Sequence, residues 1–199
     1  SVILEKNNQS FEAQLFKINN KTLDKLEIKN EEQATEISEK IKQADFSVFD
    51  LKQKTIFNSP FPPFTTSTLQ QESWQKLRFS SKQTMMLAQQ LYEQGLITYM
   101  RTDSVNISKQ AMAMTRKFIQ QEFGKNYLPS IPNVYKTKSK LSQEAHEAIR
   151  PTDINKTSLK LKDKLTSQQL KLYELIWKRF VACQMSKATL KQTTIIIKA

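Results

Sequence analysis

The sequence predicts an α+β chain with more than one domain, in which a mainly helical domain is inserted into a β-rich domain. Three observations lead to this fold class. Residues 1–58 contain alternating apolar and polar positions, residues 59–186 carry apolar residues at helical spacing, and strand-like sequence returns at 187–199. Because strand-like sequence resumes after a helical block, we expect 1–58 and 187–199 to form one β-rich domain and 59–186 to be its insertion.

The first segment is predicted to consist of strands around a single helix. Partial alternation over 11–18, a short stretch at 26–28 and renewed alternation over 46–56 each predict a strand. An asparagine followed by two glutamates opens a helical stretch over 30–43, as expected because acidic side chains are favoured in the first turn.

The second segment begins after a proline-rich stretch at 59–63, which is non-helical because proline restricts its own backbone and that of its neighbour. Gly95 and Gly124 are placed to end helices by taking a positive φ. The final β-branched stretch, 189–197, predicts a strand. Apolar spacing between these points predicts four main helices, each opened by Ser or Thr: 66–77, 80 to just before Gly95, 108–123 and 167–185.

Charge indicates the kind of partner. The chain carries a net charge of +12, but residues 1–58 hold 9 basic and 10 acidic residues, whereas residues 59–199 hold 22 and 9. The second part therefore favours a polyanion, and nucleic acid is the first candidate. One cysteine, Cys183, excludes an intrachain disulfide and is expected to be buried. One histidine cannot supply a His-rich metal site, and no metal site is expected in this chain.

The stretch richest in reactive side chains is GLITYMRTDS at 95–104. It places a phenol, a guanidinium, a hydroxyl and a carboxylate at Tyr99, Arg101, Thr102 and Asp103, between apolar anchors and the next helix. Asp103 or Ser104 is expected to cap that helix. A simpler interpretation is a helix–turn–helix connection in which Tyr99 packs and Arg101 pairs with Asp103.

This string resembles the active-site motif of type IA DNA topoisomerases, most closely those of bacteria. Two further strings, PFTTSTLQQ at 63–71 and SQEAHEAIRPTD at 142–153, resemble other motifs of the family in the same order. The resemblance implies that Tyr99 is the nucleophile and that Arg101 contacts the scissile DNA. It also implies that the helical domain is hinged on a β-rich arch domain around a hole for DNA.

The activity implied by the resemblance is ATP-independent. One DNA strand is cleaved through a 5′-phosphotyrosine intermediate, a strand is passed, and the break is resealed, which relaxes negative supercoils. The family uses Mg²⁺ held by the acidic cluster of a Toprim domain, which has no counterpart in these residues. We therefore expect the chain to be a central fragment that is inactive alone and binds no Mg²⁺ itself.

Other candidate DNA contacts come from the flanking motifs. Thr66 and Ser67 are placed to bind backbone phosphate at a helix start, with capping as the alternative. Thr102 and Asp103 either orient the loop or contact sugar and phosphate. His146 and Arg150 are expected to share one face of a short helix before Pro151 and to contact DNA phosphate.

Two other classes of function stay open. A tyrosine recombinase or type IB-like enzyme also cleaves DNA through tyrosine, but places its arginine and histidine elements before the tyrosine. A non-catalytic DNA-binding module would use the helices on duplex DNA. We expect a monomer acting on single-stranded, negatively supercoiled DNA in the bacterial cytoplasm, associated with the nucleoid, and no membrane partner, since no apolar run is long enough to span a bilayer.

Overall fold

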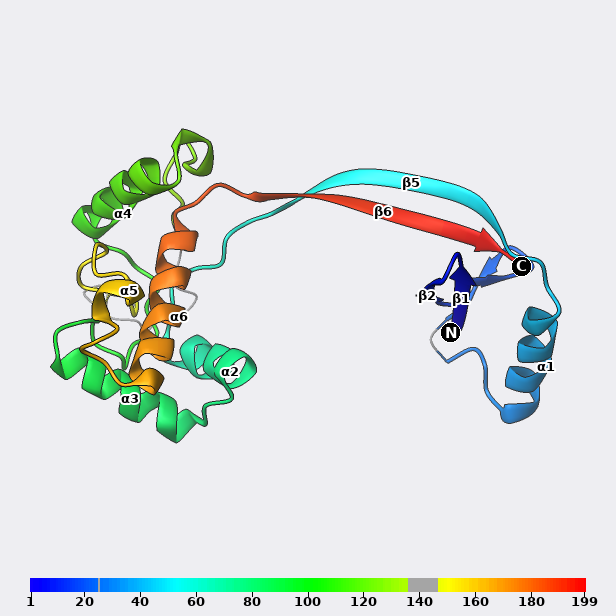
Figure 1. Ribbon diagram of the computed structural model, residues 1–199, viewed down its shortest axis with the longest axis horizontal. Helices are drawn as coiled ribbons and strands as arrows, with labels where there is room; N and C mark the ends of the chain where they lie inside the picture. Colours follow the sequence, from blue (N-terminus) through cyan, green and yellow to red (C-terminus); the bar gives the residue numbers. More distant parts are fainter. Residues whose placement is uncertain (25, 136–146) are drawn as a thin grey trace. The chain divides into compact units, whose positions relative to one another are not determined.

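The computed structural model describes residues 1–24, 26–135 and 147–199 and divides the chain into two compact units. Unit 1 comprises Ser1–Lys54 together with Gln192–Ala199, and unit 2 comprises Thr55–Lys191, so that unit 2 is inserted into unit 1 (Figure 1). Helices and strands are both present, which confirms the predicted α+β class. Each unit is described by itself.

Unit 1 begins with two antiparallel hairpins built on asparagine turns. Strands β1 (Val2–Lys6) and β2 (Gln9–Ala13) pair with Leu4 opposite Phe11, and β3 (Lys17–Ile18) pairs with β4 (Lys21–Thr22). Both turns are an Asn-Asn pair with positive φ, the conformation that suits a two-residue hairpin and that asparagine tolerates best among non-glycine residues.

The strand predicted at 26–28 is wrong. The Glu27 carboxylate accepts hydrogen bonds from the backbone N–H of Asp24, at 3.0 Å, and from Lys21 Nζ, at 2.6 Å. These contacts fold the segment into a local turn. Helix α1 (Glu31–Lys42) follows as predicted, with the Asn30 side chain accepting from the backbone N–H of Gln33.

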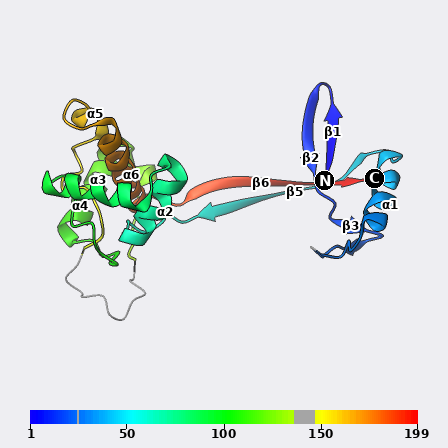
Figure 2. The same ribbon diagram turned by 90° about the horizontal axis from the view of Figure 1, so that it is seen from below.

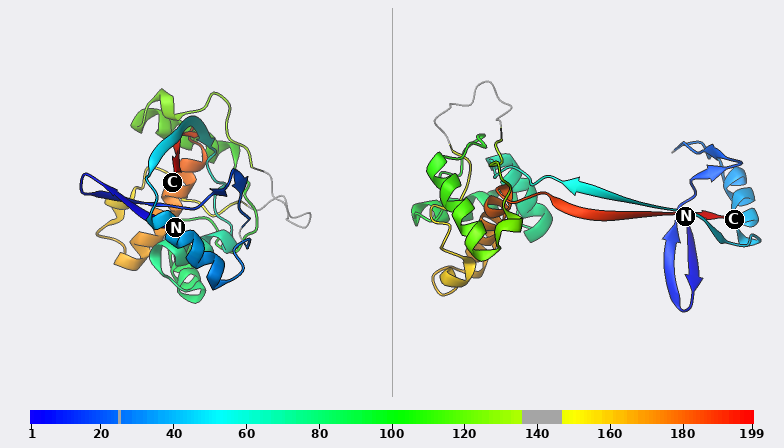
Figure 3. Two further views of the ribbon diagram at one scale, coloured as in Figure 1. Left: turned by 90° about the vertical axis from the view of Figure 1, so that its right-hand side faces the viewer. Right: turned by 90° about the horizontal axis from the view of Figure 1, so that it is seen from above.

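Two long strands, β5 (Ser47–Asn58) and β6 (Ala188–Lys198), pair with each other although residues 59–187 lie between them in the sequence, and Figure 3 shows them side by side. Their positions confirm the strands predicted near 46–56 and 189–197. Residues from both strands fall in unit 1 and in unit 2.

Unit 2 is an assembly of helices around α6 (Ser167–Cys183), which packs on the other helices of the unit (Figure 2). The predicted helices are confirmed, and each main one is capped by a hydroxyl: Thr65, Ser80, Ser108 and Thr166 accept backbone hydrogen bonds. The other elements are α2 (Thr66–Leu77), α3 (Ser81–Glu93), α4 (Lys109–Glu122), η1 (Lys125–Tyr127) and α5 (Ser158–Leu161).

Two apolar clusters form the core of unit 2. The larger lies between α2, α3 and α6 and contains Leu91, Leu172 and Ile176. The smaller packs α4 on the end of α6 and contains Phe118, Phe180 and Cys183, so the cysteine is buried as predicted. Ile97 and Met100 belong to the larger cluster. The loop that carries Tyr99 is therefore anchored in the core on both sides of the tyrosine.

Candidate active site

Three segments far apart in the sequence meet beside Tyr99. The backbone N–H of Ile149 donates to Phe64 O at 2.8 Å, that of Thr98 donates to Arg150 O at 2.9 Å, and that of Thr66 donates to Thr102 O at 2.9 Å. These bonds join the parts of the three sequence motifs that the structure describes. The site is thus assembled by short antiparallel backbone contacts between loops.

Burial alternates along the Tyr99 loop. Met100, Thr102 and Ser104 are buried, whereas Tyr99, Arg101 and Asp103 are exposed, and the Tyr99 side chain is 47% exposed. A period of two is typical of an extended chain, in which successive side chains point to opposite faces. The phenol, the guanidinium and the carboxylate therefore share the solvent-facing side of the loop.

Arg101 and Asp103 do not form the ion pair of the simpler interpretation. Among the described residues, neither side chain has a hydrogen-bond or ion-pair partner within the protein. The Arg101 guanidinium is thus available to an external anion.

Thr66 holds the loop through its hydroxyl. Its Oγ1 lies 2.8 Å from Met100 O, to which it donates, and accepts the backbone N–H of Thr102 at 2.9 Å. Thr102 in turn accepts from the backbone N–H of Ser104 at 3.1 Å. Both hydroxyls, predicted to contact DNA, are engaged inside the protein. Ser67 is exposed in the first turn of α2, and the cap of that helix is Thr65.

Thr98 is a second clamp, which the sequence analysis missed. Its Oγ1 donates to Ala148 O at 2.7 Å and accepts the backbone N–H of Arg150 at 2.9 Å. A hydroxyl flanked by the apolar anchors Ile97 and Met100 was the signal that could have indicated this role. Tyr99 is therefore held between Thr98 on one side and Thr66, acting on Met100, on the other.

Tyr92 was also missed. It lies on α3, and its ring packs edge-on against the Tyr99 ring with 5.3 Å between centroids and 69° between planes. The contact restricts the side-chain conformations that the Tyr99 phenol can adopt.

The short helix predicted before Pro151 is wrong in the part that the structure describes. The backbone N–H groups of Ala148, Ile149 and Arg150 bond to Asn106 O, Phe64 O and Thr98 Oγ1, so residues 147–150 follow an extended course. Residue His146 lies outside the described residues, and its DNA contact stays a prediction.

Arg150 is held inward, with only 13% of its side chain exposed. One terminal nitrogen donates to the Glu147 carboxylate and the other to Pro151 O at 3.0 Å, while Nε is buried without a partner among the described residues. A phosphate contact by Arg150 would have to compete with Glu147.

Asp103 and Ser104 do not cap the following helix, which corrects the prediction. The cap is Ser108, and Glu147 adds to it by accepting the Ser108 backbone N–H at 2.7 Å. Burial raises the pKa of Glu147, but hydrogen bonds from Ser108 and Arg150 outweigh it, so the pKa lies below its usual value.

The lowered pKa of Glu147 leads to a testable prediction about stability. A carboxyl with a depressed folded-state pKa contributes stability above its unfolded pKa and loses it as the pH falls through the folded value. We expect Glu147→Gln to reduce the free energy of unfolding at pH 7 and the difference from wild type to shrink below about pH 4.5. Urea unfolding at several pH values measures it, with the exposed Glu122→Gln as control. A difference that stays constant with pH would contradict it.

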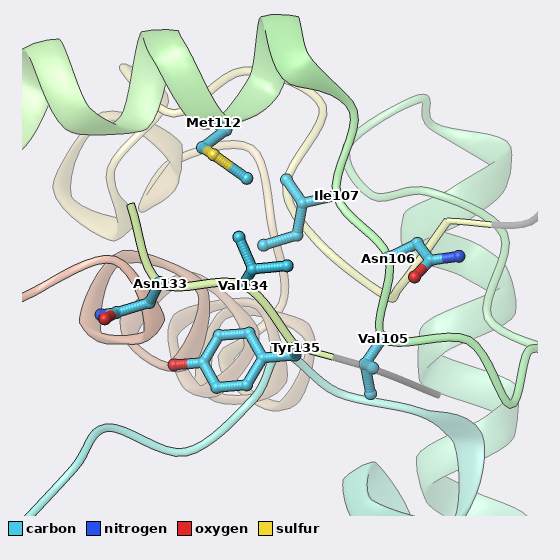
Figure 4. Close-up of a pocket in the computed structure, with 7 residues that line it drawn as sticks. All are labelled: Val105, Asn106, Ile107, Met112, Asn133, Val134 and Tyr135. Carbon is cyan, nitrogen blue, oxygen red and sulfur yellow. The ribbon is translucent and has the colours of Figure 1, made fainter. Parts of the chain in front are cut away.

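A small pocket lies between the segment that follows the Tyr99 loop, the start of α4 and residues 133–135. It has a volume of about 130 Å³ and is lined by Val105, Asn106, Ile107, Met112, Asn133, Val134 and Tyr135, as Figure 4 shows. The Tyr135 hydroxyl is 2.8 Å from Cys183 O, and burial raises the pKa of Tyr135 to about 12. Tyr135 is therefore a neutral anchor at the end of α6.

The described residues do not fit a magnesium site. No group of three or more Asp, Glu, His or Cys residues in 1–24, 26–135 and 147–199 is arranged to hold a metal ion. Asp103 stands alone and Glu147 is engaged by Arg150 and Ser108. Within the same ranges, no helix has both the length and the apolar character needed to cross a membrane.

The sequence matches a family of DNA enzymes over its whole length. The family model described as DNA topoisomerase matches residues 1–199, and the chain therefore belongs to the DNA topoisomerase family, among the type IA enzymes of bacteria.

Three curated relatives named DNA topoisomerase 1 illustrate the similarity. The Rickettsia bellii protein is 50% identical over 191 residues, covering 92% of this chain. The Campylobacter jejuni protein is 46% identical over 198 residues, covering 96%, and the Escherichia coli protein 49% identical over 170 residues, covering 85%. The match spans only 24%, 28% and 19% of the respective relatives.

A solved structure gives the same result. Full-length topoisomerase I from Thermotoga maritima aligns with a TM-score of 0.68 at 40% identity, over 82% of this chain and 27% of that one.

Proposed function

We propose that this chain carries the DNA-cleaving tyrosine of a type IA topoisomerase. The observation that carries the proposal is the exposed side of the Tyr99 loop, where a phenol and an unpaired guanidinium stand two residues apart on a backbone clamped by Thr66 and Thr98. In the reaction, Tyr99 Oη bonds to phosphorus, the bond from phosphorus to the 3′ oxygen breaks, and the 3′ oxygen takes up a proton while the phenol loses one.

Tyrosine suits a reversible break because the phosphotyrosine diester conserves the energy of the phosphodiester bond, so resealing needs no ATP. Arg101 supports the reaction because its planar fork matches phosphate oxygens and its charge stabilises the negative charge that develops on them. The clamps contribute by holding both side chains on one face before DNA arrives.

The wider activity is part of the same proposal. Passing a strand through the break relaxes negative supercoils, and single-stranded DNA is the substrate. Mg²⁺, in this proposal, is bound outside these residues by a Toprim domain. We expect the chain by itself to leave supercoiled plasmid unrelaxed.

The adduct polarity separates this function from the tyrosine recombinase or type IB alternative. A type IA tyrosine holds the 5′ phosphate, so a 3′-end-labelled oligonucleotide stays attached to the protein after cleavage. Retention of the 5′-end label instead would assign the alternative.

Binding preference tests the remaining alternative, the duplex-binding module. We expect the chain to bind a single-stranded oligonucleotide more tightly than the duplex of the same sequence at matched salt, and to weaken as salt rises because phosphate contacts release counterions. Fluorescence anisotropy with both probes measures it. Tighter binding to the duplex would support the DNA-binding module.

A further inference from the structure

We propose that the outer face of α2 is a binding site for single-stranded DNA, with Trp74 stacking on a base and Arg78 contacting a phosphate. The site consists of Ser67, Gln71, Trp74 and Arg78, all exposed and spaced so that they form one stripe along the helix, and we call it the α2 stripe. The inference rests on the proposed function, since it adds a DNA contact to a DNA-cleaving site.

Trp74 is the first observation. Its side chain is 57% exposed, and its indole N–H has no partner among the described residues. The other tryptophan, Trp177, packs edge-on against Phe118 and donates its indole N–H to Ile154 O at 2.9 Å. A single exposed aromatic side chain is common on protein surfaces and marks no site alone. The ring face and the indole N–H of Trp74 are, however, free to contact a base.

Arg78 is the second observation. It ends α2 in the left-handed conformation, with φ at 59°, where a residue with a Cβ is strained and glycine is preferred. Its side chain is exposed and has no ion-pair partner in the described part of the chain. The left-handed conformation ends the helix through the Arg78 backbone N–H, which bonds to Ser73 O and Trp74 O, and leaves the guanidinium free for an external anion.

The charges on and near the α2 stripe favour an anionic ligand. The one acidic residue of α2, Glu72, lies off the stripe, is 15% exposed, and is paired with Lys76 and Arg179. No acidic side chain on the stripe therefore opposes a phosphate, and the exposed Lys82 follows just after Arg78 in sequence. An aromatic face beside positive charge suits single-stranded DNA, whose unpaired bases stack while its phosphates meet basic side chains.

The stripe starts at the active-site loop. Ser67 follows Thr66, whose hydroxyl bonds to Met100 O. From Ser67 to Arg78 the helix rises roughly 16 Å, a length that accommodates a few nucleotides. The α2 stripe therefore begins one residue away from a contact with the Tyr99 loop, and in this proposal the flank of a strand cleaved at Tyr99 lies along it.

The test measures binding of an oligothymidylate of about 12 nucleotides by the chain, in a Tyr99→Phe background that excludes covalent chemistry. We expect Trp74→Ala to weaken the affinity about tenfold and Trp74→Phe, which keeps a stacking ring, to weaken it less. Gln75→Ala, an exposed neighbour on the same helix, is the matched control and should bind as the parent does.

The substitution Arg78→Gly distinguishes a loss of DNA binding from a loss of stability. We expect it to weaken binding and to lower the salt slope by about one, while the Tm does not fall, because glycine relieves the backbone strain. Unchanged affinity in both Trp74→Ala and Arg78→Gly would show that the α2 stripe does not bind DNA. That result would leave the proposed role of Tyr99 intact if the parent protein still forms the covalent adduct. If polyglutamate quenched the tryptophan emission as much as the oligothymidylate does, the proposal would likewise be overturned, because the ligand would then be an acidic polypeptide.

Discussion

Tyr99→Phe is expected to abolish the covalent protein–DNA adduct while leaving folding and DNA binding intact. The phenylalanine keeps the aromatic ring and its edge contact with Tyr92, so only the nucleophilic oxygen is lost. Because the side chain is half exposed and its hydroxyl makes no hydrogen bond within the described residues, no buried group is left unpaired.

The measurement uses a chimera in which these residues replace the matching part of the Escherichia coli DNA topoisomerase 1, which is 49% identical over 170 residues. Labelled single-stranded DNA is mixed with protein, denatured and resolved by electrophoresis, so that an adduct appears as label at the mass of the protein. Tyr92→Phe is the matched control, since it removes a hydroxyl from the neighbouring ring. Adduct at the parent level in Tyr99→Phe would remove Tyr99 from the role of nucleophile.

Arg101→Ala is expected to slow cleavage by roughly 10²–10³-fold, the usual cost of removing one preorganised donor that stabilises transition-state charge. The fold should be unaffected, because the guanidinium is exposed and has no partner in the described residues. Arg101→Lys should recover part of the rate, since the charge remains but the planar fork is lost.

Single-turnover cleavage in the same chimera gives the rates, and urea unfolding checks the stability. Lys117→Ala, which removes an exposed charge from α4, controls for a general loss of positive charge. A cleavage rate for Arg101→Ala equal to that of the control would make Arg101 an ordinary surface residue.

The sequence determined the features that depend on neighbours in the chain. Ser80 caps its helix through a backbone N–H three residues ahead, and Gly95 takes a φ of 66° after α3. The strings around Tyr99 indicated the family and identified Tyr99 and Arg101 as candidate site residues. All of this follows from local backbone geometry and side-chain chemistry.

The tertiary structure alone decided how the motifs meet and which side chains stay available. Thr66 reaches Met100 across 34 positions, Thr98 reaches Ala148 across 50, and Glu147 reaches Ser108 across 39. Local spacing predicted a helix that would present Arg150. Long-range hydrogen bonds drew that segment into an extended course and turned Arg150 inward, because a buried backbone N–H must find a partner wherever the fold provides one.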